Sequence, residues 1–218
     1  TIYRAQYTIS DDNVEQADID INITGAQNPS GNVQDPYQEV DAFDVDTVAP
    51  GVTALTVSDT VITDADVGFY FYVNITYSED MDTSVNPTIT FTPDVKGSGT
   101  LTSETITWPD ATHCSVRYTI ADVNEEQTGV DIDVTGAKDV AGNTMNAYSA
   151  VDQFDVDTRN PTATVALSTT LITDADAGSY FWVNITYDET MDTTQNPTVT
   201  FSPDVKASGT LTSETFNW

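Results

Sequence analysis

The chain has 218 residues, of which 35 are Asp or Glu and six are Lys or Arg, so its formal net charge at pH 7 is −29. A surface this acidic repels the phosphates of nucleic acids and anionic lipids, so we expect neither as a partner. The single cysteine, Cys114, excludes a disulfide framework. No apolar run is long enough for membrane insertion and no signal peptide is present, so we expect any export signal to lie outside this sequence.

The sequence repeats itself. The segment that starts at Tyr70 returns almost letter for letter at Tyr180, 110 residues later. The motif FDVDT that ends at Thr47 returns at Thr158, 111 residues later, so one residue is lost in the stretch after Pro161. A unit of this length copied in tandem predicts a string of similar domains rather than one enzyme fold.

The repeat divides the chain into three parts. Residues 1–46 match the second half of a repeat, residues 47–157 form one complete repeat, and residues 158–218 match the first half. Two interpretations remain open. The chain is either a window on a much longer array, or its two half repeats complete each other between copies, which would build a head-to-tail fibre by strand addition.

Within the complete repeat, β-branched and aromatic residues alternate with polar ones, the pattern typical of half-buried strands. We predict strands near 52–58, 69–77, 87–92, 100–108, 114–120, 129–135 and 149–156. Seven short antiparallel strands in about 110 residues predict an all-β fold, an immunoglobulin-like β-sandwich. The side chains expected to share the core are Phe71, Val73, Ile75, Tyr77, Val130, Ile132 and Val134, with Trp108 and Tyr118 as core or rim aromatics.

Acidic residues gather in the loops of this predicted sandwich. Because the strands alternate in direction, each loop is assigned to one end of a repeat, and acids from adjoining repeats meet at two junctions. We expect the first junction to gather Asp12, Glu15, Asp44 and Asp46 with Glu79 and Asp82. We expect the second to gather Asp64, Asp66, Asp122, Glu125, Asp155 and Asp157 with Glu189 and Asp192.

Carboxylates crowded together repel strongly unless a cation lies between them. Calcium accepts roughly six to eight oxygen ligands at flexible angles, whereas zinc prefers nitrogen and sulfur ligands. The sequence therefore predicts calcium as a cofactor that stiffens the junctions. The segment ITDADVG is not an EF-hand loop, because Ile75 stands at the twelfth position. The alternative is that these acids are solvated turn residues, since Asp is favoured in turns whatever it binds.

The pattern Y-[SD]-E-x-MDT…NPT[IV]TF, the K-D-x-AGN turn and the closing F-D-V-D-T-x-x-P resemble bacterial immunoglobulin-like repeats. Such repeats occur in very large secreted adhesins and cell-surface proteins. The resemblance covers the whole chain. It implies an extracellular or cell-surface extender that holds an adhesive or ligand-binding domain away from the cell, with calcium at the joints and neighbouring copies as partners.

The resemblance also indicates which residues of this chain correspond to the family's acidic positions. Those that match the family's linker acid and acidic loop are Asp46, Glu79 and Asp82 at one joint and Asp157, Glu189 and Asp192 at the other. The first segment has AQNPSGN where the complete repeat has AKDVAGN. Because of this departure, the resemblance does not carry a ligand role over to Asp139.

Three sequons begin at Asn22, Asn74 and Asn184, and strand parity places Asn74 and Asn184 on the outward face. In an archaeal or eukaryotic host these two would carry glycans, and in most bacteria they would be ordinary strand residues.

The outward face also holds one aromatic pair in each copy, formed by Tyr70 and Tyr72 and by Tyr180 and Trp182. Two interpretations of these rings remain open: they form lateral contacts between neighbouring strings of domains, or neighbouring strands and loops shield them. Aromatic rings on a sheet face also stack on sugars, so a carbohydrate-binding or adhesive module is the alternative function. An enzyme is not expected, because the only histidine, His113, adjoins Cys114 on a strand and the two side chains point to opposite faces.

Overall fold

A computed structural model describes residues 1–218, and it confirms the predicted all-β class, with 42% of residues in strands and 3% in helices. The chain divides into two compact units, Thr1–Arg159 and Asn160–Trp218. The first unit contains residues 1–46 together with the complete repeat, and the second contains nearly all of residues 158–218. The predicted boundaries at 46/47 and 157/158 stay predictions, and the boundary between the compact units follows the second of them by two residues.

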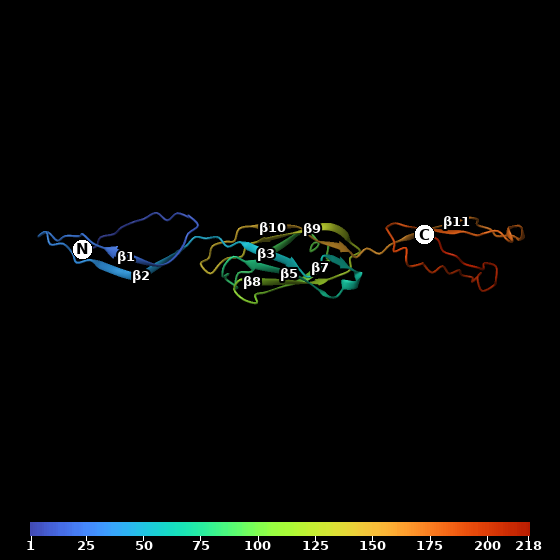
Figure 1. The fold of residues 1–218 in the computed structure, drawn as a ribbon, viewed down its shortest axis with the longest axis horizontal. Helices are drawn as coiled ribbons and strands as arrows, with labels where there is room; N and C mark the ends of the chain where they lie inside the picture. Colours follow the sequence, from blue (N-terminus) through green and yellow to red (C-terminus); the bar gives the residue numbers. More distant parts are fainter. The chain divides into compact units, whose positions relative to one another are not determined.

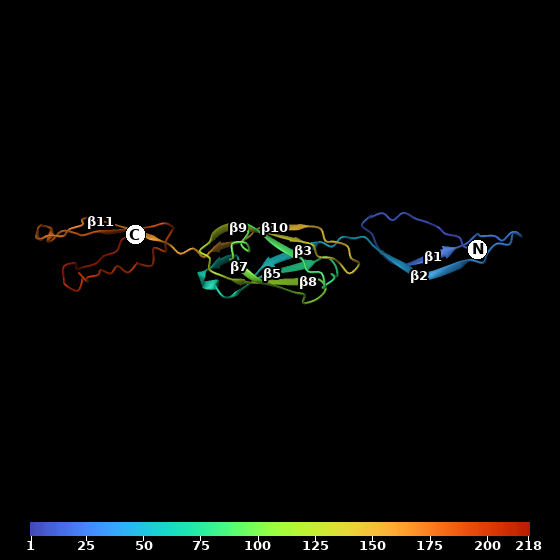
Figure 2. The same ribbon diagram turned by 180° about the vertical axis from the view of Figure 1, so that it is seen from behind.

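The complete repeat folds into two four-stranded sheets that lie face to face (Figures 1 and 2). One sheet has the order β3-β5-β8-β7 and is antiparallel throughout. Its strands are β3 (Val52–Val57), β5 (Tyr70–Tyr77), β7 (Leu101–Thr107) and β8 (His113–Ile120). The other has the order β4-β10-β9-β6. Its strands are β4 (Val61–Thr63), β6 (Thr88–Thr92), β9 (Glu126–Thr135) and β10 (Tyr148–Asp157).

All seven predicted strands are present, and one element was missed. The segment ITDADVG, which the sequence predicted as a loop, begins with the short strand β4 and continues into a 3-10 turn, η1 (Asp64–Asp66). β4 runs parallel to β10, with Val61 opposite Asp155. A strand of three residues is too short to show an alternating pattern of apolar and polar side chains. Its hydrogen-bonding partner lies far along the chain, so the local sequence alone does not identify β4 as a strand.

The predicted core is confirmed. The inward residues of β5 and β9 are all 3% exposed or less, and Tyr118 is fully buried. The Phe71 and Phe154 rings, one from each sheet, lie 4.6 Å apart between centroids. Trp108 is half-buried at the rim, where it stacks on Tyr77 at 5.6 Å. Burial of each such side chain stabilises the sandwich by about 1.5–3 kcal/mol.

Each flanking segment holds one pair of antiparallel strands. In residues 1–46, β1 (Glu15–Ile23) pairs antiparallel with β2 (Tyr37–Asp46). In the second unit, β11 (Ala163–Leu167) pairs antiparallel with β12 (Val183–Tyr187), and η2 spans Asp174–Asp176. The register of β1 on β2 follows that of β9 on β10 with the offset of the sequence repeat: Ile19 lies opposite Phe43 as Val130 lies opposite Phe154.

The residue lost after Pro161 is a β-bulge. In the complete repeat, Val52 pairs with Tyr77 and Ala54 with Thr76, so Thr53 is an extra residue on β3. In the second unit β11 and β12 pair without interruption, residue against residue. A bulge adds one residue to one strand without changing which faces the flanking residues occupy. The two copies therefore keep the same inward positions although their lengths differ by one.

Candidate metal centre

Three carboxylates from distant parts of the first unit meet at one end of the sandwich. Asp46 is the last residue of β2, Glu79 lies in the loop after β5, and Asp139 lies in the turn after β9. One oxygen of each carboxylate lies within 4.8 Å of the other two. Asp139 is buried and the other two are half-buried, so the cluster is set into the protein rather than spread over its surface.

The KDVAGN turn holds Asp139 rigidly. Oδ1 of Asp139 accepts hydrogen bonds from the backbone N–H groups of Gly142 and Asn143, at 2.7 and 2.8 Å. Its Oδ2 accepts from Nδ2 of Asn143 at 2.9 Å. Gly142 has a φ of +97°, a conformation that residues with a Cβ rarely adopt. The side chain of Asp139 is thus fixed by its own turn, and only 1% of the residue is exposed.

Asn143 links this turn to the end of β2. Its Nδ2 donates to Oδ1 of Asp46 at 3.3 Å and to the backbone oxygen of Asp46 at 3.4 Å. Oδ1 of Asp46 also accepts from the backbone N–H of Val48 at 3.0 Å. Asp46 is therefore held both by the chain that follows it and by the turn after β9.

The loop that carries Glu79 is fastened to the same turn. The backbone N–H of Asp82 donates to the oxygen of Lys138 at 2.8 Å, and that of Val140 donates to the oxygen of Asp80 at 3.3 Å. Between them, Met81 forms a bridge with Asp139 and is 2% exposed. These contacts fix the spacing between Glu79 and Asp139.

Glu79 is surrounded by other negatively charged carboxylates. Partial burial raises the pKa of the Glu79 carboxyl, and repulsion from Asp139, Asp46 and Glu15 raises it further. Since the pKa rises when the charged form is disfavoured, ionised Glu79 is destabilised by its surroundings. A cation between the carboxylates would reverse that repulsion.

The other residues predicted at the first junction lie outside the cluster of three carboxylates. Glu15 lies near enough to act on Glu79. Asp44 accepts a hydrogen bond from the backbone N–H of Asp18 at 2.9 Å, which caps a left-handed residue of β1. Asp82 accepts from the backbone N–H and the hydroxyl of Ser84, and these bonds lower the pKa of Asp82. Asp12 accepts from the Ser10 hydroxyl at 3.5 Å.

The residues predicted at the second junction are divided between the two compact units. Most of the six in the first unit cap turns or loops through their side chains. Asp66 binds the N–H and hydroxyl of Thr63, Asp122 the N–H of Asn124, Glu125 the hydroxyls of Ser98 and Thr100, Asp155 the N–H of Gly129 and Asp157 the N–H of Arg159, while Asp64 lies in η1.

Glu189 and Asp192 lie in the second unit, where Asp192 accepts from the N–H and hydroxyl of Thr194. These bonds lower the pKa of Asp192. The second junction stays a prediction.

The set of metal ligands predicted from the sequence does not include Asp139. The counterpart of Asp139 in the first segment is Asn28, and this difference concealed its place in the cluster. The available signal was the turn itself, because an Asp three residues before a Gly-Asn pair is positioned to accept their backbone N–H groups.

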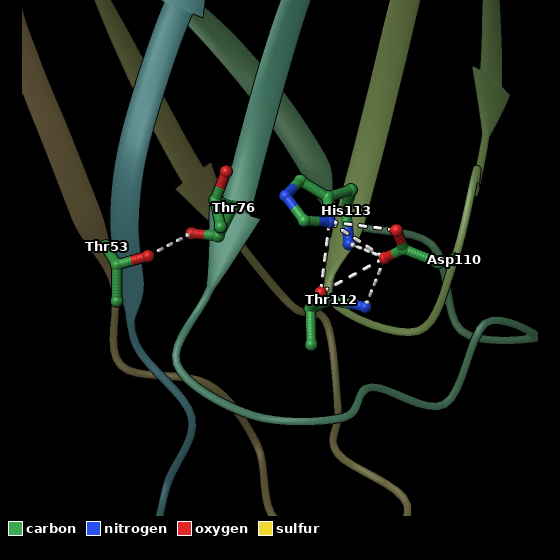
Figure 3. A network of polar contacts seen from close by, with 5 residues as sticks. All are labelled: Thr53, Thr76, Asp110, Thr112 and His113. Carbon is green, nitrogen blue, oxygen red and sulfur yellow. Dashed lines mark hydrogen bonds and ion pairs between the residues drawn. The ribbon is translucent and has the colours of Figure 1, made fainter.

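Figure 3 shows a second polar cluster, around the only histidine. Oδ1 of Asp110 accepts from the backbone N–H groups of Thr112 and His113, both at 2.9 Å. The Asp110 carboxylate and the Thr112 hydroxyl both contact Nδ1 of His113, at 2.8 and 3.0 Å. A catalytic relay needs its acid and its nucleophile on opposite ring nitrogens, so this arrangement caps the turn between β7 and β8 instead.

The outward face of β5 carries the sequon and the aromatic pair. Oδ1 of Asn74 accepts from the Ser115 hydroxyl at 2.8 Å, and Asn74 is exposed. The Arg117 guanidinium lies 4.4 Å from the centre of the Tyr70 ring. Arg117 therefore occupies one face of the ring that a sugar would use in the complete repeat.

No family model, curated protein or solved structure matches this chain. None of its helical segments has the length and apolar character needed to cross a bilayer.

Proposed function

We propose that this chain is an extracellular structural repeat protein, a spacer, stalk or fibre on a microbial surface, whose immunoglobulin-like domains are stiffened by calcium at their junctions. The observation that supports it most directly is the cluster of Asp46, Glu79 and Asp139 between the end of β2 and the sandwich that follows. It joins the last strand of one repeat to two loops of the next.

The strand order supports the domain type. Lettered in chain order, β3, β5, β7 and β8 correspond to strands A, B, D and E of an immunoglobulin domain, and β6, β9 and β10 to C, F and G. The observed orders β3-β5-β8-β7 and β10-β9-β6 then match ABED and GFC, with β4 as an added edge strand beside β10. Domains of this kind serve many functions, so the proposed structural role rests on the carboxylate cluster rather than on the fold.

The donor set fits calcium. Calcium binds oxygen ligands at about 2.3–2.6 Å, so two ligands on opposite sides of the ion are separated by about 5 Å. The three carboxylates, with oxygens within 4.8 Å of one another, meet that requirement. A half-turn of the Asn143 amide would add its Oδ1 as a neutral ligand. The ion would neutralise the repulsion around Glu79 and supply no chemistry beyond charge and coordination.

Such an ion would act as a mechanical link. Asp46 belongs to the segment that precedes the sandwich, whereas Glu79 and Asp139 belong to loops of the sandwich itself. Bending at the linker would pull Asp46 away from the other two and break the coordination. The high negative charge elsewhere would keep parallel strings from collapsing together.

Calorimetric titration of the full chain with calcium, together with thermal melts in calcium and in EDTA, tests this proposal. Calcium at ten times its Kd stabilises the bound state by about 1.4 kcal/mol, so we expect a rise in Tm. Glu79→Gln is expected to abolish most of the binding heat and the rise in Tm. Asp80→Asn, a matched change on an exposed neighbour in the same loop, is expected to preserve both. Equal melts of the unaltered chain in calcium and EDTA, without binding heat, would overturn the calcium proposal.

A further inference from the structure

The N-I-T sequon on β5 has no part in the proposed metal junction. It consists of Asn74, Ile75 and Thr76. Ile75 is 1% exposed and belongs to the core, whereas Asn74 is exposed and Thr76, two residues further along the strand, shares its outward face. The side-chain nitrogen that a sequon offers for modification therefore lies at the surface of the folded sandwich, where a bulky attached group meets solvent.

One hydrogen bond orients the Asn74 amide. Its Oδ1 accepts from the Ser115 hydroxyl on β8 at 2.8 Å, and its Nδ2 donates to no other group of the chain. N-linked glycosylation uses Nδ2 and leaves Oδ1 in place, so a glycosylated side chain keeps its bond to Ser115. Ser115 thus fixes the amide through the atom that the modification does not use.

A hollow of about 280 Å³ adjoins Asn74 on the outer face of the sheet. Besides Asn74, the side chains that line it on this face are those of Ala54, Thr56, Thr76, Pro109, His113 and Ser115. Its volume lies just below the range of roughly 300–1,000 Å³ that is usual for small-molecule sites. The hollow therefore suits a single sugar ring better than a larger ligand.

The polar groups of the hollow match the hydroxyls of a sugar. Thr56 lies opposite Asn74 on β3, and the hydroxyls of Thr56 and Thr76 both line the space beside it. His113 lies opposite Thr76 on the neighbouring strand β8 (Figure 3). The Asp110 carboxylate contacts Nδ1 of His113 at 2.8 Å, which leaves Nε2 available to a sugar hydroxyl.

The sequon on β5 recurs where the sequence repeats. Asn184 occupies the position of Asn74, 110 residues later, and lies on β12. The sequon at Asn22 is not repeated, because its counterpart in the complete repeat is Asp133. Of the three sequons, the shared one is therefore the one next to the hollow.

We propose that Asn74 is an N-glycosylation site, and that the first sugar of its glycan occupies the hollow beside it. The donor is a sugar whose C1 carries a lipid-linked phosphate or pyrophosphate, and a glycosyltransferase of the host catalyses the transfer. The bond from C1 to the phosphate oxygen breaks, and a bond from C1 to Nδ2 forms. One proton leaves Nδ2, and the phosphorylated lipid departs with the electron pair of the broken bond.

The transfer is expected to precede folding of the sandwich. β5 pairs with β3 on one side and with β8 on the other, so its backbone is not accessible to an enzyme once the sheet has formed. The glycan then has to fit the finished fold, and the hollow provides that space. A bulky, hydrated group here would keep the outer face of one string of domains from packing against another.

Mass spectrometry of the chain isolated from the cells that produce it tests the modification. Cleavage after glutamate separates the three sequons, because peptides 16–39, 40–79 and 127–189 hold one each. We expect peptide 40–79 to carry a glycan that fragmentation places on Asn74. A peptide 40–79 that is entirely unmodified would overturn the inference.

A matched pair of variants, secreted from a eukaryotic host, tests the sequon. Thr76→Ala keeps Asn74 but removes the hydroxyl that completes the sequon, and is expected to abolish the glycan. Thr76→Ser keeps a hydroxyl and is expected to retain the glycan. The peptide that holds Asn22 is unchanged in both variants and controls for the activity of the host transferase. Equal modification of Asn74 in the two variants would overturn the inference.

The unmodified chain, made in a host without N-glycosylation, distinguishes an attached sugar from a bound one. The ring signals of His113, the only histidine, are expected to shift in the glycosylated chain. They are expected to stay unchanged when up to about 10 mM N-acetylglucosamine is added to the unmodified chain, because the covalent link supplies an effective concentration in the millimolar range or above. Saturable binding of the added sugar would overturn the role of Asn74, and unchanged signals in the glycosylated chain would overturn the placement of the first sugar.

The inference relies on the proposed extracellular location, because the transfer takes place on chains that are being exported. It does not rely on calcium. The calcium titration uses the unmodified chain, so an empty junction and an unmodified Asn74 are separate results and each proposal fails without the other.

Discussion

Asn143 donates from one side-chain nitrogen to Asp46 and to Asp139, at 3.3 and 2.9 Å, although 97 residues separate it from Asp46. The amide bridges the segment before the sandwich and the turn after β9. This contact sets Asp46 beside Asp139, and the loop pairing around Met81 sets Glu79 beside both. The distances between the three carboxylates are therefore set by hydrogen bonds from the Asn143 amide and from the backbone of the two loops.

The raised pKa of Glu79 gives a pH dependence with a definite sign. A group whose pKa is higher in the folded than in the unfolded state stabilises the fold below its unfolded pKa, and that contribution is lost as pH rises through the folded pKa. In EDTA, we expect the Glu79 contribution to stability to increase as pH falls from 7 toward the ordinary glutamate pKa of about 4.3. Urea unfolding of the unaltered chain and of Glu79→Gln across this range measures it. Parallel pH profiles for the two proteins would contradict the expectation.

Asp139 is expected to have a structural role that does not depend on the ion. Asp139→Ala leaves the backbone N–H groups of Gly142 and Asn143 without their acceptor, at a cost of about 1–3 kcal/mol. Asp139→Asn keeps an oxygen for those groups and removes the charge, so it should lose calcium binding with a smaller loss of stability. Urea unfolding in EDTA compares the two, and equal stabilities of Asp139→Ala and the unaltered chain would refute the structural role.

The core of the complete repeat should tolerate truncation far less than the first segment does. Ile132→Ala removes a fully buried side chain, and we expect a loss of about 2–5 kcal/mol in the free energy of unfolding. Ile21→Ala, at the equivalent position of the first segment, should cost less than about 1 kcal/mol in dilute solution, because Ile21 is 42% exposed. Chemical unfolding at low protein concentration measures both values. Similar losses of stability in the two variants would show that Ile21 is buried in solution and would contradict the expectation.

The bulge at Thr53 should be dispensable. Its deletion would give β3 the uninterrupted register that β11 already has, with every flanking residue on its present face. The lost bond is that from the Thr53 hydroxyl to the oxygen of Thr76, at 3.2 Å (Figure 3). We expect the deletion variant to fold with a change in stability of about 1 kcal/mol or less. Nuclear Overhauser contacts across β3 and β5 would report the register, and an unfolded variant would contradict the equivalence of the two pairings.

Cys114 should be unreactive in the folded protein. It is 1% exposed, and burial raises the pKa of its thiol to about 12. Because the thiolate is the reactive form, reaction with a disulfide reagent at pH 8 should follow unfolding rather than the chemistry of an accessible thiol. The rate should therefore increase with urea in parallel with unfolding of the sandwich. Fast labelling of the folded chain would contradict the burial.

The sequence by itself determined the all-β class, the seven strands and the inward residues, because side-chain alternation along a strand is a local property that packing preserves. Tertiary structure alone decided that Val61–Thr63 forms a strand, since its hydrogen-bonding partner is β10. It also decided which acids meet. Asp44, Asp82 and Asp155 bind nearby backbone or side-chain groups, while Asp139 comes beside Glu79 through a turn that only the folded chain brings there. Composition gives the number of carboxylates, but the distances between them depend on hydrogen bonds between loops that are far apart in the sequence.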